Sequence, residues 1–493
     1  LARKLAQKRA QTTPGPVPNG IARISQRQPL PFTFPVTAAA PPPLPQRAPV
    51  KSFAIRPLKS NGVDPVATLP VELLLIIFSL LPLRALTSSS GVSKPWRRLL
   101  AAHRYLWRDL DLALDCKNNI PVAAFAALTK RAGTHLRSLV ITGLTTELTG
   151  AAWRSLALVP SHHPNLASLE IHPGHRCTAG GSSHLTASIL ATMVGPNLTS
   201  LRLPGCAGVN DSGLRVILAK STRLESVDFS QCPNLDGNGF APGGDEPVQP
   251  SSLRRVKLKG CRAFTSQGIH ELAKHHPHVT ELDLTACPHV TVTALSDLGI
   301  RRLRNLESLT LWNHASLTSE ALAGTFEHLE RLTTFYLLAS RVVDHRVIAA
   351  LGSSSAKTIP LRSLSLPSSA HASEADWIQL FARATFLEHL NAASCPGITP
   401  AALAHLPATL KSLDVSGLSA VTDAAVKSVA VACPDLMRLG ISGTRVTEKG
   451  LQYAVALLPH LRHIDALRCP HISALALNKI RESGDICLDW SYE

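Results

Sequence analysis

The sequence predicts an α/β solenoid, in which about thirteen strand-helix units stack side by side after a small three-helix module. Three observations predict this architecture. One leucine pattern returns thirteen times after residue 136. Aromatic residues form only 4% of the chain although 45% of it is hydrophobic, which suits many small packing layers better than one large core. Residues 69–110 carry a helical periodicity that does not follow the leucine pattern.

The amino-terminal segment differs from the rest in charge. Residues 1–63 hold ten Lys or Arg and no acidic residue, so they carry +10 of the net charge of +16. The segment is also rich in proline, and such a composition cannot bury enough apolar surface to offset its ordering entropy. We therefore expect residues 1–64 to be a disordered basic tail. A solvated linker is favoured over an import signal or a docking tail. Because the first residue is Leu1, we expect the natural start to be missing.

Residues 65–112 are predicted to be the helical module. Pro70 suits a first helical turn and Pro82 ends the helix, while a second stretch runs over 83–90 and a third begins near Pro95. About 40 residues are too few to be stable alone, so we expect the module to pack on the repeats. The apolar stripe of the first helix, at i, i+3, i+4, i+7 and i+8, consists of Leu73, Ile76, Ile77, Leu80 and Leu81.

The repeats occupy residues 113–493 in this prediction. Each has the form Leu-x-x-Leu-x-Leu, and most spacings lie within the leucine-rich-repeat window of about 20 to 29 residues. The last two leucines are two apart, so a strand points both inward, and stretches such as 422–434 and 447–459 have helical spacing after a capping Thr. One strand and one helix per unit predict a horseshoe with parallel strands on its concave side. The units begin at residues 136, 166, 198, 224, 253, 279, 306, 332, 361, 387, 410, 436 and 461.

Cysteines recur at one place in the repeat. We expect these thiols to be reduced, to fill space at the turn after each strand and to meet a backbone carbonyl. A metal site is disfavoured, because ligands one repeat apart would form a ladder and not a tetrahedron. We expect neither a metal nor a cofactor. The residues concerned are Cys206, Cys232, Cys261, Cys287, Cys395 and Cys469.

These features resemble two known families. The repeats are similar to the cysteine-containing subfamily of leucine-rich repeats, most closely over Leu201–Leu214, and the resemblance covers about residues 136–490. The helical module resembles the F-box, which docks the small adaptor of a cullin-based (SCF) ubiquitin ligase. Arg84 departs from the pattern, which more often has an acidic or polar residue there. The resemblance implies that an adaptor-binding surface is formed or supported by Leu69, Pro70, Leu73, Leu74, Ile77, Phe78, Val92 and Trp96.

The concave face is the expected place for a target protein. Three cations on one strand need an acidic partner or solvent, and two aromatic residues one repeat apart suggest an exposed ledge. The alternative is that the cations pair with Glu281 and Asp283 beside them, in salt bridges of little energetic value. The candidate target-binding residues are Arg202, Arg255, Lys257, Lys259, Trp312 and Tyr336.

The sequence thus predicts a non-catalytic, substrate-recognition subunit of an SCF-type ubiquitin ligase. Its partners would be the adaptor, through it the cullin, and target proteins that are acidic or phosphorylated. The alternative is a leucine-rich-repeat scaffold in a repair or signalling complex, with the helical module serving only as a cap. The longest apolar run, 73–83, is too short to span a bilayer. We expect neither membrane nor nucleic-acid binding, and a location in the cytoplasm, the nucleus or both.

Overall fold

The computed structural model describes residues 65–113, 122–144, 163–173, 187–243, 252–296, 299–312, 317–338, 342–351, 360–482 and 486–489. All of them fall within one compact unit, residues 38–493. The expected disordered tail, 1–64, lies outside the described residues. Within the described ranges, no helix is long and apolar enough to cross a membrane.

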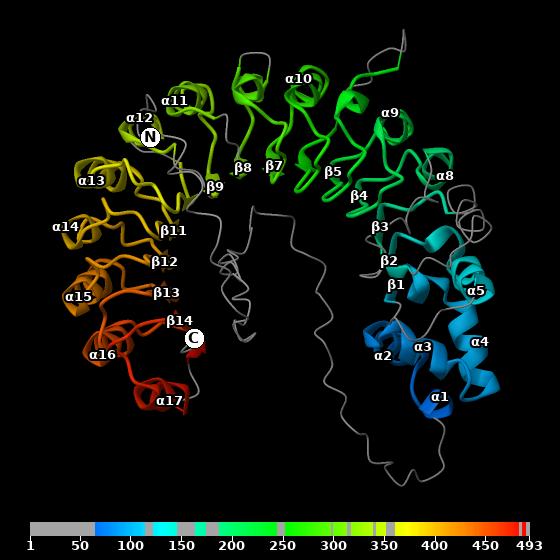
Figure 1. Cartoon of the computed structure of the whole chain (residues 1–493). Coiled ribbons are helices and arrows are strands. Elements are labelled where there is room, and N and C mark those ends of the chain that lie inside the picture. The colour runs from blue at the N-terminus through cyan, green and yellow to red at the C-terminus, as the bar shows by residue number, and fades with distance from the viewer. Residues whose placement is uncertain are drawn as a thin grey trace, which may run out of the picture. The chain divides into compact units, whose positions relative to one another are not determined.

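A single sheet of fifteen parallel strands forms the backbone of the described unit, and its strands follow one another in chain order. Helices lie on the outer side of the curve and strands line the inner side (Figure 1). The predicted α/β leucine-rich-repeat solenoid is confirmed. Every one of the thirteen predicted units has its strand, and each strand begins two residues after the first residue of the unit. These are β2 (Ser138–Leu144), β3 (Ser168–Pro173), β4 (Ser200–Arg202), β5 (Ser226–Asp228), β6 (Arg255–Lys257), β7 (Glu281–Thr285), β8 (Ser308–Trp312), β9 (Thr334–Leu338), β10 (Ser363–Ser365), β11 (His389–Asn391), β12 (Ser412–Asp414), β13 (Arg438–Gly440) and β14 (His463–Asp465).

Two further strands extend the sheet beyond the predicted thirteen. β1 (Asp109–Ala113) pairs with β2, and β15 (Cys487–Asp489) pairs with β14. In the first of them, Trp107 takes the place of the first leucine, with Leu110 and Leu112 at the two strand positions, and all three are buried. The predicted boundary between residues 112 and 113 therefore falls inside β1, so the helical module and the sheet share this strand.

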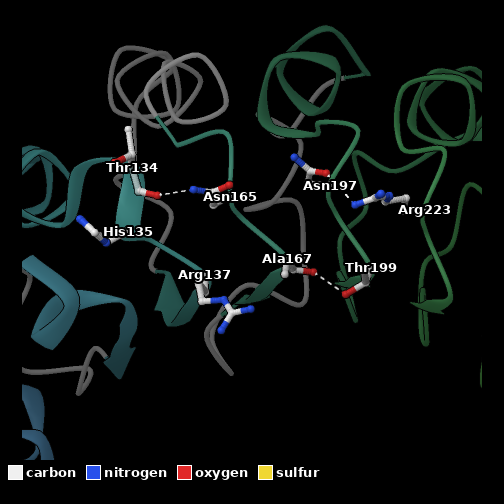
Figure 2. Close-up of a pocket in the computed structure, with 8 residues that line it drawn as sticks. All are labelled: Thr134, His135, Arg137, Asn165, Ala167, Asn197, Thr199 and Arg223. Atoms are coloured by element: carbon white, nitrogen blue, oxygen red, sulfur yellow. Dashed lines mark hydrogen bonds between the residues drawn. The ribbon is translucent and has the colours of Figure 1, made fainter.

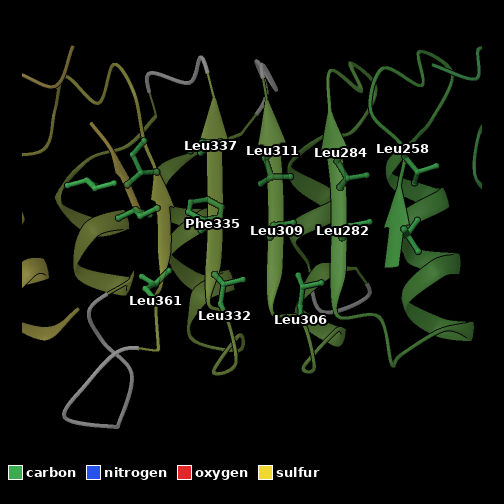
Figure 3. Close-up of a cluster of buried hydrophobic side chains, with 14 of the residues drawn as sticks. Leu258, Leu282, Leu284, Leu306, Leu309, Leu311, Leu332, Phe335, Leu337 and Leu361 are labelled. Atoms are coloured by element: carbon green, nitrogen blue, oxygen red, sulfur yellow. The ribbon is translucent and has the colours of Figure 1, made fainter. Parts of the chain in front are cut away.

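The core is a set of parallel rows of buried side chains that run from strand to strand. Leu309 and Leu311 of β8 pair in register with Phe335 and Leu337 of β9, and each of the four is at most 1% exposed. Figure 3 shows these side chains stacked in layers with those of the neighbouring repeats. Because each layer contacts only the next, the core grows by repetition and not around one centre.

Helices and short turns of 3-10 helix close the repeats on the outer side. Several of the helices begin at a side-chain cap, as at Thr447, whose hydroxyl accepts from the Lys449 amide (3.2 Å). Helices α15 and α16 confirm the two predicted helical stretches, although Thr422 at the start of α15 makes no capping hydrogen bond. The helices are α5 (Val122–Ala132), α8 (Ala187–Met193), α9 (Asp211–Lys220), α10 (Ser266–His275), α11 (Ser319–Phe326), α12 (His345–Leu351), α13 (Glu374–Arg383), α14 (Pro400–Leu403), α15 (Asp423–Ala432), α16 (Glu448–Leu457) and α17 (Ala474–Glu482). The 3-10 turns are η2 (Gly133–His135), η3 (Asn238–Phe240), η4 (Val292–Leu295) and η5 (Ile300–Arg302).

The cysteines link neighbouring repeats as expected. The thiol of Cys261 donates to the carbonyl of Phe229 (3.0 Å), one repeat earlier, and Cys287 does the same to Leu258 (3.1 Å). Cys232, Cys395 and Cys469 repeat this bond. Burial raises the pKa of the Cys261 and Cys287 thiols to about 12, so both are protonated donors.

The helical module comprises α1 (Pro65–Thr68), α2 (Val71–Leu80), α3 (Leu83–Ser89), α4 (Lys94–Ala102) and the 3-10 turn η1 (Arg104–Trp107). The three predicted helices are α2, α3 and α4. Helices α2 and α4 contact η1, and α3 contacts β1. The module therefore packs on the first strand of the array, as its small size requires.

Candidate functional site

Helix α2 has apolar residues on both of its sides. Pro70 precedes it, Glu72 lies in its first turn, where a negative charge is favourable, and Pro82 follows its end. Its inner side carries Leu74 and Phe78, each only 2% exposed. The Phe78 ring meets the ring of Trp96 from α4 edge to face, with centroids 5.2 Å apart. This contact fixes which side of α2 faces the core.

The opposite side of α2 is apolar and exposed. Ile76 is 58% exposed and Leu80 is 72% exposed, and Val92, in the turn before α4, is 65% exposed. Ser93 caps α4 by accepting from the Trp96 amide (3.3 Å), which fixes the backbone next to Val92. We use the name docking face for the exposed apolar side chains of α2 and of the segments just before α2 and α4: Leu69, Val71, Leu73, Ile76, Ile77, Leu80 and Val92.

The eight predicted adaptor-binding residues divide into two groups. Leu69, Pro70, Leu73, Ile77 and Val92 are exposed, whereas Leu74 and Phe78 are buried and Trp96 is partly buried. The second group holds the helices together and positions the first. Three exposed members of the docking face were not among the predicted site residues: Val71, Ile76 and Leu80. Helical spacing places Ile76 and Leu80 beside Leu73 and Ile77, whereas Val71 lies in the first turn of α2.

Two of the four candidate cations on the concave side are neutralised by neighbouring strands. Arg202 of β4 lies 3.0 Å from Glu170 and 3.5 Å from Asp228, and Lys257 of β6 lies 3.2 Å from Glu281. For Lys257 the structure matches the alternative of pairing with Glu281, whereas the partners of Arg202 were not predicted. The charges of both cations are already compensated.

The other two cations on β6 and just after it differ. Within the described part of the chain, neither Arg255 nor Lys259 makes an ion pair, and Lys259 is exposed. Asp283, expected as a possible partner, instead accepts from the amide of Thr285 within its own strand (2.9 Å). Arg255 and Lys259 are therefore the cations of this strand that remain available to a ligand.

The expected exposed aromatic ledge is wrong at Tyr336. This residue is only 8% exposed, and its hydroxyl lies 2.7 Å from the hydroxyl of Ser363 on β10. The adjacent strand carries small residues there, so the phenol ring lies against the sheet and does not project from it. Trp312 is opposite Leu338 in the register, two positions further along the strand than Tyr336.

The described residues hold no group of three or more His, Cys, Asp or Glu suited to a metal ion. The geometry instead provides two surfaces that are suited to binding. One is the apolar docking face at one end of the sheet, and the other is the largely polar concave side along it. Apolar faces bind by excluding water, and free guanidinium and ammonium groups bind oxyanions.

Comparison with known proteins agrees with a separate helical module before the repeats. The F-box-like family model matches residues 66–113. A Caenorhabditis elegans protein named as putative RNA-binding protein EEED8.10 is 24% identical over 412 residues, which is 81% of this chain and 50% of that protein. The chain thus spans about half the length of this relative.

Among solved structures, the complex of Rad7 and Elc1 in yeast is similar in fold. The match has a TM-score of 0.53 and 17% identity, and it covers 83% of this chain and 98% of the other. The likeness concerns the fold alone. With its F-box-like domain at residues 66–113 and the leucine-rich-repeat array that follows, the chain is an F-box/leucine-rich-repeat protein.

Proposed function

We propose that this protein is the target-recognition subunit of an SCF-type cullin ubiquitin ligase. The docking face binds the adaptor, and the repeat array binds a protein that is to be ubiquitinated and degraded. The chain itself performs no chemical step. Its contribution is to hold the target near the ubiquitin-charged enzyme, so that the reaction becomes effectively unimolecular.

The exposure of the α2 stripe is the observation that carries this proposal. A helical unit that only caps a solenoid needs a polar outer face. Here Ile76 and Leu80 are each more than half exposed, and they lie one turn apart on the same side of α2. A contiguous apolar patch of this kind is typical of a protein-protein interface. Docking of a second protein explains it, and capping does not.

The yeast match supports assembly with a second protein, since Rad7 was solved together with Elc1. A chain of this fold can therefore act as a member of a complex. The same observation also suits the alternative, a scaffold within a larger complex. Adaptor binding distinguishes the two, because only the ligase subunit requires it.

The test is capture of purified SCF adaptor by the full chain. We expect a one-to-one complex with the wild type and at least a tenfold loss of affinity in Leu73→Asp/Ile77→Asp, because two carboxylates would have to be buried at the interface. Both side chains are nearly half exposed, so the variant should keep its fold.

The matched control is Val431→Asp/Leu475→Asp. These residues are 73% and 67% exposed on α15 and α17, so the control makes the same chemical change on the outer helices of the last repeats. It should bind the adaptor like the wild type. Failure of a folded wild-type chain to bind, or equal losses in both variants, would favour the scaffold alternative.

A further inference from the structure

A pocket opens at the edge of the sheet where strands β2, β3 and β4 begin. Its volume is about 480 Å³, within the usual range for ligand pockets of roughly 300 to 1,000 Å³. The three successive units that contain β2, β3 and β4 supply most of its wall (Figure 2). The lining residues are Thr134, His135, Arg137, Asn165, Ala167, Asn197, Thr199 and Arg223.

The lining is cationic and rich in hydrogen-bond donors. It contains two arginines and a histidine, together with amide and hydroxyl groups, and no carboxylate. Glu225 occupies, in the next repeat, the place that Thr199 has in its own, but it does not line the pocket. A wall of this composition favours an oxyanion over a cation or an apolar group.

Cations are also favourable near helix carboxyl ends, where they donate to the last carbonyls. This second role for the arginines depends on carbonyls that still lack a donor. The carbonyls at this edge already have donors. Asn165 donates to Thr134 (2.9 Å), Asn197 donates to Pro164 (2.9 Å), and Lys220 donates to Ala191 (2.8 Å). These bonds run from one repeat to the one before it, and they leave the two guanidinium groups uncommitted to carbonyls.

The two arginines retain nearly all of their donors. Arg223 uses one of its five N–H groups, toward Asn197 Oδ1 (3.2 Å), which holds its side chain against the wall. Arg137 makes no side-chain hydrogen bond or ion pair with any described residue. Both side chains are exposed, so two planar guanidinium groups at the same cavity are open to a ligand.

We propose that this pocket binds an oxyanion, phosphate or carboxylate, carried by a side chain of the target protein. The proposal rests on the target-binding part of the proposed function and gives that target a chemical class. A nucleic acid is the less favoured ligand, because the lining has no aromatic side chain on which a base would stack, other than the His135 imidazole. The pocket is separate from the concave cations Arg255, which lies on β6, and Lys259, which follows that strand.

The test measures binding of the full chain to three degenerate nine-residue peptide libraries, with central phosphoserine, glutamate or serine, in the absence of adaptor. We expect the phosphoserine or glutamate library to bind at least tenfold more tightly than the serine library. Inorganic phosphate should compete. Whichever charged library wins identifies the source of the oxyanion.

Arg137→Gln/Arg223→Gln should remove this preference. The matched control, Arg331→Gln/Arg462→Gln, changes exposed arginines at the same two repeat positions in other units and should retain it. Arg137→Lys/Arg223→Lys keeps the charge and should keep part of the affinity, because an ammonium lacks the planar fork of a guanidinium.

Equal binding by the three libraries, equal losses in both glutamine variants, or displacement by single-stranded RNA and not by phosphate would each overturn the proposal. Adaptor capture is measured separately on the same variants. A variant that loses peptide binding but keeps the adaptor supports the pocket, whereas loss of adaptor binding alone by the α2 variant concerns only the ligase assignment.

Discussion

The indole nitrogen of Trp107 donates to the carbonyl oxygen of Leu100 at 3.0 Å. Leu100 lies near the end of α4, and Trp107 fills the first core position of the first strand unit. The guanidinium of Arg131 lies over the same ring, 4.6 Å from its centre. One fully buried side chain therefore joins the helical module to the array.

Trp107→Phe should lower the free energy of unfolding by about 1–3 kcal/mol, because it leaves the Leu100 carbonyl without this donor in a buried place. The measurement is chemical denaturation, together with limited proteolysis between α4 and β1. Trp377→Phe is the control: Trp377 is also fully buried, but its indole nitrogen has no partner among the described residues. Equal losses in the two variants would contradict this account of the junction.

The repeat cysteines should resist alkylation while the protein is folded. Burial raises the pKa of the Cys206, Cys261 and Cys287 thiols to about 12, so little thiolate exists at pH 8. Mass spectrometry after brief iodoacetamide treatment should find Cys487, which is exposed, modified well before them. In denaturant the difference should vanish. Rapid labelling of Cys261 in the native chain would show that neighbouring repeats separate while the protein is folded.

Asp414→Asn should stabilise the protein at neutral pH. Burial raises the pKa of the Asp414 carboxyl, so in the wild type stability is lost as the pH rises from the unfolded pKa through the folded one. Asparagine carries no charge and can keep the turn, since Asn391 makes the equivalent bond one repeat earlier.

The gain should be on the order of 1 kcal/mol at pH 7, the usual scale for a poorly compensated buried group, and should shrink below about pH 4. Thermal unfolding at pH 3 and pH 7 measures it. A gain that is the same at both pH values would show that the charge of Asp414 is not its cause.

The unpaired cations on β6 and just after it should matter more for target capture than the paired ones. We expect Arg255→Gln/Lys259→Gln to weaken capture of an acidic target at least fivefold without changing adaptor binding. Arg202→Gln/Lys257→Gln should have less effect, since Arg202 and Lys257 are already neutralised by Glu170, Asp228 and Glu281. The measurement is target pull-down at two salt concentrations. The reverse order of effects would remove β6 from the target-binding surface.

The array was predictable in detail because its pattern is a packing rule. A residue such as Leu309 must occur at a fixed offset from Leu306 and Leu311 if one side of every strand is to be buried, so spacing alone located thirteen strands. The two end strands depart from this rule. Trp107 replaces a leucine in the first, and in the last the position that should hold the first leucine is Asp485.

The orientation of α2 and the burial of Tyr336 were not predictable in the same way. Helix α2 is apolar on both sides, so periodicity cannot say which stripe faces inward; the contact of Phe78 with Trp96 decides it. The exposure of Tyr336 depends on the size of its neighbour Ser363, in a different repeat. Both properties belong to pairs of residues far apart in the sequence.

Because the strands follow one another in chain order, the number of repeats sets the distance between two surfaces of the protein. Five strand steps separate β1, against which the helical module packs, from β6, which carries Arg255 and precedes Lys259. At about 4.8 Å per step, this corresponds to about 24 Å measured along the sheet. Inserting or deleting one repeat between them would move a bound target by one step and one increment of twist, while leaving both surfaces intact. Repeat number is thus an evolvable length scale, which could match targets of different size to one fixed catalytic partner.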